Sequence, residues 1–166
     1  MKIRNMILTS VLLAIGFVLH SIVPAFFGMK FDLLLTFMFI AIAINPTLKN
    51  TVLSGLLSGL ITAMTTTFPG GQIPNLIDKM ITALIVYSLI KVMGTGVAKI
   101  GIIGFIGTLS SGIIFLTSAL AIVGLPAPMN LLIMTIVIPS AVANTAITVV
   151  VYKAVQIAIK PQKSLI

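Results

Sequence analysis

Apolar runs separated by short polar breaks fill almost the whole chain. Most of these runs come close to the roughly 20 residues that a helix needs to cross the hydrocarbon core of a bilayer. The pattern therefore predicts an all-α membrane protein with six transmembrane helices and a single domain over residues 1–166. The expected helices are Asn5–Val23, Leu33–Ile44, Thr51–Phe68, Asn75–Met93, Val97–Val123 and Met129–Ile159.

The second and sixth runs depart from the standard length. Leu33–Ile44 is short for a span, and Met129–Ile159 is longer than a bilayer requires. Pro139 lies inside the sixth run and is expected to kink it, because proline lacks the N–H that the helix would use.

Composition supports the membrane interpretation. Hydrophobic residues make up 59% of the chain and charged residues only 7%, whereas a soluble domain keeps a charge-rich surface. The net charge of +8 does not indicate nucleic-acid binding, because the basic residues stand singly between apolar runs. Cysteine is absent, so no cysteine-based metal site is possible, and neither a metal nor a cofactor is expected.

The basic residues predict the orientation. With the N-terminus inside, the outer side holds only Lys30 and Lys79, and both termini are cytoplasmic, as the positive-inside rule favours. The inner side holds Lys2, Arg4, Lys49, Lys91, Lys99, Lys153, Lys160 and Lys163.

Small residues four apart predict close helix contacts. Gly55 and Gly59 lie in the third run, and Gly104, Thr108 and Gly112 lie in the fifth. In a bilayer such spacing lets helix backbones approach each other, so packing is the expected role.

Polar residues predict a pocket near the outer surface. Asn75, Asp78, Lys79 and Thr82 share one face of the fourth helix. Further polar faces are Ser140, Asn144 and Thr148 in the sixth run, and Thr108, Ser111, Phe115 and Ser118 in the fifth.

Two interpretations of Asp78 and Lys79 stay open. They could fix the depth of the helix at the interface, and as neighbours they point in different directions and need not pair. Alternatively they hold a zwitterion, with Asp78 on its ammonium and Lys79 and Asn75 on its carboxylate. His20 is similarly either a satisfied interfacial residue or a ligand-binding or proton-carrying one.

Catalysis and nucleotide binding are not expected. His20 and the serines lack a nucleophile motif, and residues 94–99 lack the spacing of a phosphate loop. The protein is therefore predicted not to be an enzyme.

Three segments resemble the bacterial tryptophan transporter family. They are FPGGQIPNLIDK at residues 68–79, GMKFD at residues 28–32, and LTSAL with VGLP at residues 116–126. The resemblance covers nearly the whole chain, and that family is similar to the substrate-binding subunits of energy-coupling-factor (ECF) transporters. It implies a six-helix bundle in the bacterial plasma membrane that captures L-tryptophan outside.

The resemblance also implies partners, namely a membrane coupling subunit and two cytoplasmic ATPases. Docking in such subunits uses small residues four apart on the first helix, and the matching pair here is Ser10 and Ala14, with serine in place of the first alanine.

Given tryptophan as ligand, further residues receive expected roles. Phe68 and His20 lie near the indole, Gly70 and Gly71 let the loop backbone approach it, and Gln72 or Asn144 accepts its N–H. Lys30 and Asp32 are expected to pair across the mouth with Asp78 and Lys79.

Two other functions stay open. A carrier working alone on an ion gradient would use Asp78 or His20 for coupling, and a membrane assembly factor would bind no small molecule.

Overall fold

The computed structural model describes residues 3–26 and 29–159, and helices dominate it. Two short strands, β1 and β2, pair antiparallel in the link between the first two helices, with Ala25 opposite Lys30. The elements are α1 (Ile3–Ile22), β1 (Ala25–Phe26), β2 (Met29–Lys30), α2 (Leu33–Ile44), α3 (Leu48–Thr65), α4 (Gln72–Met93), α5 (Val97–Ile122), α6 (Met129–Leu132), the π-helix η1 (Ile133–Val137) and α7 (Ile138–Ile159).

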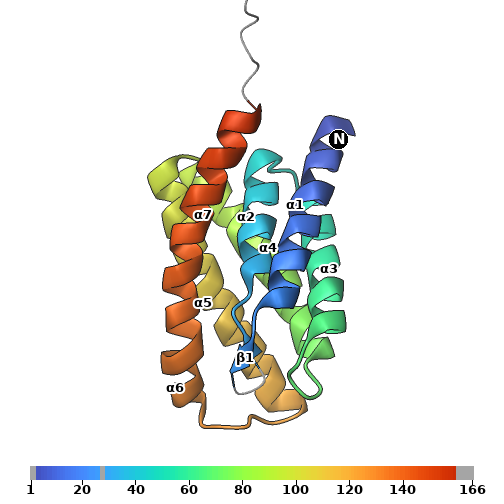
Figure 1. Cartoon of the computed structure of the whole chain (residues 1–166), viewed down its shortest axis with the longest axis vertical. Coiled ribbons are helices and arrows are strands. Elements are labelled where there is room, and N and C mark those ends of the chain that lie inside the picture. Colours follow the sequence, from blue (N-terminus) through green and yellow to red (C-terminus); the bar gives the residue numbers. More distant parts are fainter. Residues whose placement is uncertain (1–2, 27–28, 160–166) are drawn as a thin grey trace, which may run out of the picture.

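Since α6, η1 and α7 form one continuous helical segment, the described chain is a bundle of six helical segments, as the apolar runs predict. The first residues of α1 and the last of α7 lie at the same end of the bundle, and β1 and α6 lie at the opposite end (Figure 1). We call these the terminal end and the hairpin end.

Helix α2 forms the centre of the bundle. Ten of its twelve residues are buried, from Leu34 to Ala43, and it packs against α1, α3, α4, α5 and α7. A helix buried all round needs apolar residues on every face, which explains why this run carries no polar stripe. Its bounds are those predicted from sequence.

Three helices are long and apolar enough to cross a membrane by length and composition: Ile3–Ile22, Val97–Ile122 and Met129–Ile159. Helix α2 is a shorter apolar helix. Helices α3 and α4 fall outside this group because each carries a polar face, and those faces are buried against protein. Polar residues inside a bundle lower the mean hydropathy of a helix without exposing it to lipid.

Helices α3 and α4 begin three residues earlier than the apolar pattern predicts. Thr47 caps α3, because its hydroxyl accepts a hydrogen bond from the Asn50 N–H at 3.3 Å. The predicted third helix extends to Phe68, whereas α3 ends at Thr65 and Phe68 lies in the following loop. Apolar periodicity does not detect a polar cap, and it counts an apolar loop residue as helix.

The last helical segment departs from regular α-helix near Pro139, where the sequence predicts a kink. The π-helical turn Ile133–Val137 ends two residues before this proline, and the helix continues through it. Proline cannot donate to the carbonyl four residues earlier, and a π-turn is one way in which a helix accommodates that loss.

The predicted small-residue contacts are present. A Cβ added at Gly55 would lie 2.9 Å from the Ala83 Cβ, and one added at Gly59 would lie 3.2 Å from the Leu76 Cα. Similarly, a Cβ at Gly104 would lie 3.1 Å from the Thr148 Oγ1. These glycines therefore allow α3 to pack on α4 and α5 to pack on α7.

We expect Gly55→Ala to destabilise the protein by about 1–3 kcal/mol, because the added methyl group overpacks a tight interface. The apparent midpoint of thermal unfolding in detergent, followed by circular dichroism, measures the change. Gly96→Ala is the matched control, because a Cβ there meets nothing nearer than the Lys99 Cδ at 3.9 Å. Equal midpoints for the two variants would contradict the close contact.

Candidate functional site

A cavity lies toward the hairpin end of the bundle and is lined by residues from all six helical segments and their connections. It has a charged and hydroxyl-bearing part and an aromatic part. Its lining residues are His20, Lys30, Asp32, Leu35, Thr62, Thr66, Thr67, Phe68, Asn75, Asp78, Lys79, Thr108, Ser111, Gly112, Phe115, Ile136, Val137 and Ser140.

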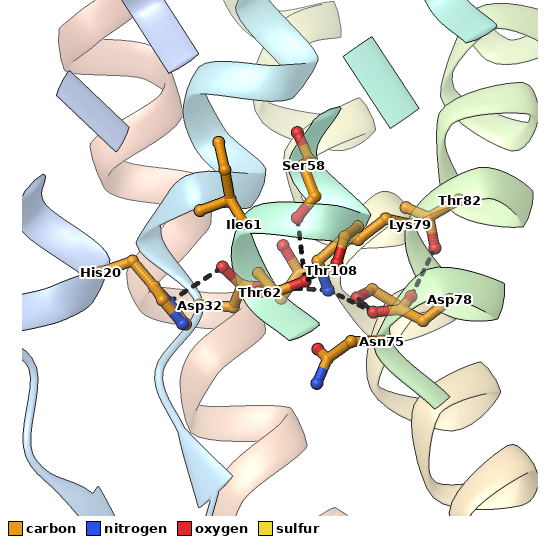
Figure 2. A network of polar contacts seen from close by, with 12 residues as sticks. His20, Asp32, Ser58, Ile61, Thr62, Asn75, Asp78, Lys79, Thr82 and Thr108 are labelled. Atoms are coloured by element: carbon orange, nitrogen blue, oxygen red, sulfur yellow. Dashed lines mark hydrogen bonds and ion pairs between the residues drawn. The ribbon is translucent and has the colours of Figure 1, made fainter. Parts of the chain in front are cut away.

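A network of buried charges forms the polar part (Figure 2). Lys79 pairs with Asp78 on its own helix, and its Nζ lies 2.7 Å from the Asp32 Oδ2 before α2. The side chains of Lys79 and Asp78 are 2% and 1% exposed, whereas that of Asp32 is 16% exposed. A lysine buried to this extent requires counter-charges, and two carboxylates supply them.

Asp78 is held on every side by protein donors. Its Oδ1 accepts a hydrogen bond from the Thr82 hydroxyl at 2.9 Å, and its Oδ2 accepts one from the Ser111 hydroxyl at 2.8 Å in addition to Lys79. These contacts connect α4 to α5 and fix the position of the carboxylate.

Asp78 and Lys79 contact each other, a point that the sequence left open. Neighbouring residues leave a helix in different directions, so their spacing alone did not predict the pair. The four-carbon stem of Lys79 is long enough to bring its ammonium group back to Asp78, and burial favours that contact over an unpaired charge. The predicted pairing of Asp32 with Lys79 is present, whereas no ion pair of Lys30 occurs within the described part of the chain.

His20, at the end of α1, contacts the same network. Its Nδ1 lies 3.2 Å from the Asp32 Oδ1, and the residue is buried. Burial alone would raise the pKa of Asp32, but the neighbouring Lys79 charge and His20 hold that pKa below its usual range. Asp32, in the link before α2, is therefore a carboxylate at neutral pH.

The aromatic part of the cavity consists of Phe68 and Phe115. Their ring centroids are 5.3 Å apart and the rings meet edge to face. Phe68 comes from the α3–α4 loop and Phe115 from α5, and both are buried. With Ile136 and Val137 of η1 they form an apolar wall beside the charged network.

Three predicted amide residues lie in different surroundings. Asn75 lines the cavity and donates to the Gly71 carbonyl at 2.8 Å. Gln72 is exposed and Asn144 is buried, and neither is among the lining residues. Asn144 donates to the Asp32 carbonyl at 3.1 Å and to the Thr108 hydroxyl at 3.4 Å, so it positions the segment that carries Asp32.

The two loop glycines have conformational roles, and neither lines the cavity. Gly70 has a φ of +70°, a conformation that residues with a side chain rarely adopt. A Cβ on Gly71 would lie 2.8 Å from the Thr66 hydroxyl oxygen. Both glycines shape the turn that presents Phe68 to the cavity.

Several lining residues carry no signal that sequence reasoning detects. Thr62 and Thr66 come from the end of α3 and its loop, and Ile136 and Val137 come from the π-turn. Ser111 was predicted only as part of a polar face, and its four-residue spacing with Phe115 was the available signal. Nothing in the local sequence distinguishes an isoleucine facing a cavity from one facing lipid.

Ser10 and Ala14 lie on the outer surface of α1, whereas His20 at the end of the same helix is buried in the site. The predicted docking pair is therefore accessible from outside the bundle. Apolar residues surround it, with Ile7 57%, Val11 50% and Val18 54% exposed.

The site offers charges and hydrogen-bonding groups rather than a metal centre. Within residues 3–26 and 29–159, no group of three or more histidine, cysteine, aspartate or glutamate side chains is arranged so that it could hold a metal ion. Paired opposite charges beside an aromatic wall suit a small amphipathic molecule that carries charge at one end.

Comparisons with known proteins agree on one family. The model of the family described as "Tryptophan transporter TrpP" matches residues 2–160. A "Probable tryptophan transport protein" of Bacillus subtilis strain 168 is 42% identical over 161 residues, which cover 94% of this chain and 92% of the relative. Its namesake in Clostridium perfringens strain 13 is 44% identical over 173 residues, which cover 94% of this chain and 95% of the relative. No solved structure matches this chain.

Proposed function

The chain belongs to the tryptophan transporter TrpP family, a family of transporters and not of enzymes, and we propose that it is the substrate-binding subunit of an ECF-type ABC transporter for tryptophan. In this proposal the chain spans the plasma membrane six times, with both termini in the cytoplasm. The hairpin end then faces outward, and its cavity receives L-tryptophan. A membrane coupling subunit and two cytoplasmic ATPases supply the energy.

The observation that carries the proposal is the pairing of a charged and an aromatic part in one cavity. An amino acid needs an anion for its ammonium group and a cation or N–H groups for its carboxylate, and both carboxylates and lysines line this cavity. An indole needs flat apolar surface, and Phe68 and Phe115 provide it. Among the predicted residues, His20, Lys30, Asp32, Phe68, Asn75, Asp78 and Lys79 line this cavity.

The distribution of basic residues supports the proposed orientation. Four basic residues lie in the helical turns nearest the terminal end of the bundle: Arg4, Lys49, Lys91 and Lys99. Two others, Lys30 and Lys79, lie toward the hairpin end. An excess of lysine and arginine marks the cytoplasmic side of a membrane protein. In the proposed orientation the cavity therefore opens on the outside, as uptake requires.

A carrier that works alone on an ion gradient is the second candidate, because buried ionisable groups at membrane depth often mark proton or ion pathways. Asp78 or His20 would then couple transport to ions. The two candidates differ in their requirement for ATPases, and both bind tryptophan. A membrane assembly factor would bind none.

Tryptophan binding is directly measurable, because the chain contains no tryptophan and only 2 tyrosines. Purified protein in detergent is titrated with L-tryptophan while the anisotropy of indole emission is followed. We expect a saturable rise in anisotropy, since a bound indole tumbles with the protein. Absence of saturable binding, in protein shown by circular dichroism to be folded, would overturn the proposed function.

A matched pair of variants on α5 locates the site. Phe115→Ala removes one half of the aromatic wall and is expected to weaken tryptophan binding about 3- to 10-fold. Phe105→Ala, at a position that is 37% exposed, is expected to leave the affinity unchanged. Equal affinities for the two variants would place the indole elsewhere.

A further inference from the structure

The two carboxylates of the cavity are not equivalent. Asp78 is 1% exposed, and protein donors already occupy both of its oxygens: Thr82 on Oδ1, and Ser111 and Lys79 on Oδ2. A ligand ammonium that bound Asp78 would have to displace one of these contacts inside the bundle.

Asp32 has unused capacity to accept hydrogen bonds. Its side chain is 16% exposed, and only its Oδ2 holds Lys79. Its Oδ1 is itself buried and lies 3.2 Å from the His20 Nδ1, but it makes no aligned hydrogen bond with any described residue. A carboxylate oxygen in a cavity normally finds a donor, and an incoming ammonium group would supply one.

Lys30 is the corresponding unpaired cation. It lines the cavity, it is only partly buried, and it makes no ion pair among the described residues. Lys30 and Asp32 are two apart, and the chain between them is not helical. Both side chains line the same cavity, so one small ligand can contact both.

The formal charges of the cavity fall into an internal pair, Asp78 and Lys79, and two remaining charges, Asp32 and Lys30. Lys79 and Asp78 cancel each other as a buried internal pair, which leaves one negative charge on Asp32 and one positive charge on Lys30. A cavity with one accessible charge of each sign matches a zwitterion better than it matches a cation or an anion.

We infer that Asp32 binds the α-ammonium group and Lys30 binds the α-carboxylate of the ligand, and that the Asp78–Lys79 pair positions Asp32 without touching the ligand. This inference rests on the proposed function and deepens it. It assigns recognition of the amino-acid group to the segment between β2 and α2. Asn144, which donates to the Asp32 carbonyl, is then a positioning residue.

Three indole compounds of different charge test the assignment: L-tryptophan, tryptamine, which has only the ammonium, and indole-3-propionate, which has only the carboxylate. Asp32→Asn should weaken tryptophan and tryptamine by about 10- to 100-fold and leave indole-3-propionate unweakened, because a charge-assisted hydrogen bond is lost. Lys30→Met should weaken tryptophan and indole-3-propionate and leave tryptamine unweakened. Asp32→Glu keeps the negative charge, so it should bind tryptophan and tryptamine more tightly than Asp32→Asn does.

The double variant Asp78→Asn/Lys79→Met removes the internal pair without changing the net charge. Because Asp32 keeps its charge in this variant, binding of tryptamine should persist, weakened less than by Asp32→Asn. If the double variant instead loses amine selectivity while Asp32→Asn keeps it, Asp78 holds the ammonium and the inference is wrong. That result leaves tryptophan binding intact, whereas failure of the unaltered protein to bind tryptophan overturns the proposed function as well.

Discussion

Lys79→Met is expected to destabilise the protein more than any other single change in the charged network. The substitution leaves the buried Asp78 carboxylate and the partly buried Asp32 carboxylate close to one another without their shared cation. Breaking a buried ion pair by removing one partner costs about 3–5 kcal/mol, because the remaining charge is uncompensated. Asp78→Asn should cost less, since Lys79 keeps Asp32 as its counter-charge.

The double variant Asp78→Asn/Lys79→Met separates charge from packing. Its side chains resemble the originals in size, and only Asp32, the most exposed member, keeps a charge. We expect its apparent midpoint of thermal unfolding to lie above that of Lys79→Met and close to that of Asp78→Asn. Circular dichroism is the suitable measurement, because the chain has neither tryptophan nor cysteine to report unfolding. A Lys79→Met midpoint equal to that of the unaltered protein would show that the ammonium group is not needed as a counter-charge.

The bundle could be predicted from sequence because its main signal is the length of apolar runs. The bounds of α2, Leu33–Ile44, follow from Asp32 on one side and Asn45-Pro46 on the other. Both ends of α3 and the start of α4 were less accurate, since a hydroxyl cap and loop glycines determine them. The β1–β2 hairpin could not be foreseen, because strands of two residues leave no periodic pattern.

The polar side of the cavity was also predictable to a useful degree. A charged residue in an apolar chain is costly, so the sequence alone marks each of Asp32, Asp78 and Lys79 as a candidate. The sequence could not show which groups these residues contact. The hydroxyl of Ser111, 33 residues later in the chain, donates a hydrogen bond to Asp78, and this contact depends on how α5 packs on α4.

The apolar side was harder to predict. Phe68 was recognised through a motif, whereas Ile136 and Val137 were not singled out from the sequence. Isoleucine and valine are equally common on helix faces that contact lipid and on faces that line a cavity, so residue type alone does not identify them.

Ala14→Leu is expected to abolish tryptophan uptake by cells while leaving tryptophan binding by the purified protein unchanged. Ala14 is exposed on α1 and lies four residues after Ser10, and small residues at this spacing let a second helix approach closely. A leucine would hold a coupling subunit away from α1. Because the side chain points out of the bundle, it does not reach the cavity.

Ala146→Leu on α7 is the matched control, because it adds the same side chain to another exposed helical surface. Uptake of labelled tryptophan should continue in cells with this variant and stop with Ala14→Leu, at equal amounts of protein in the membrane.

This difference in uptake also separates the two candidate functions. A carrier that works alone has no partner to dock on α1, so uptake that survives Ala14→Leu, and that continues in sealed vesicles without ATPases, would replace the ECF proposal by ion-coupled transport. Loss of uptake with retained binding, together with no transport in sealed vesicles that lack ATPases, is the result expected of a docked binding subunit.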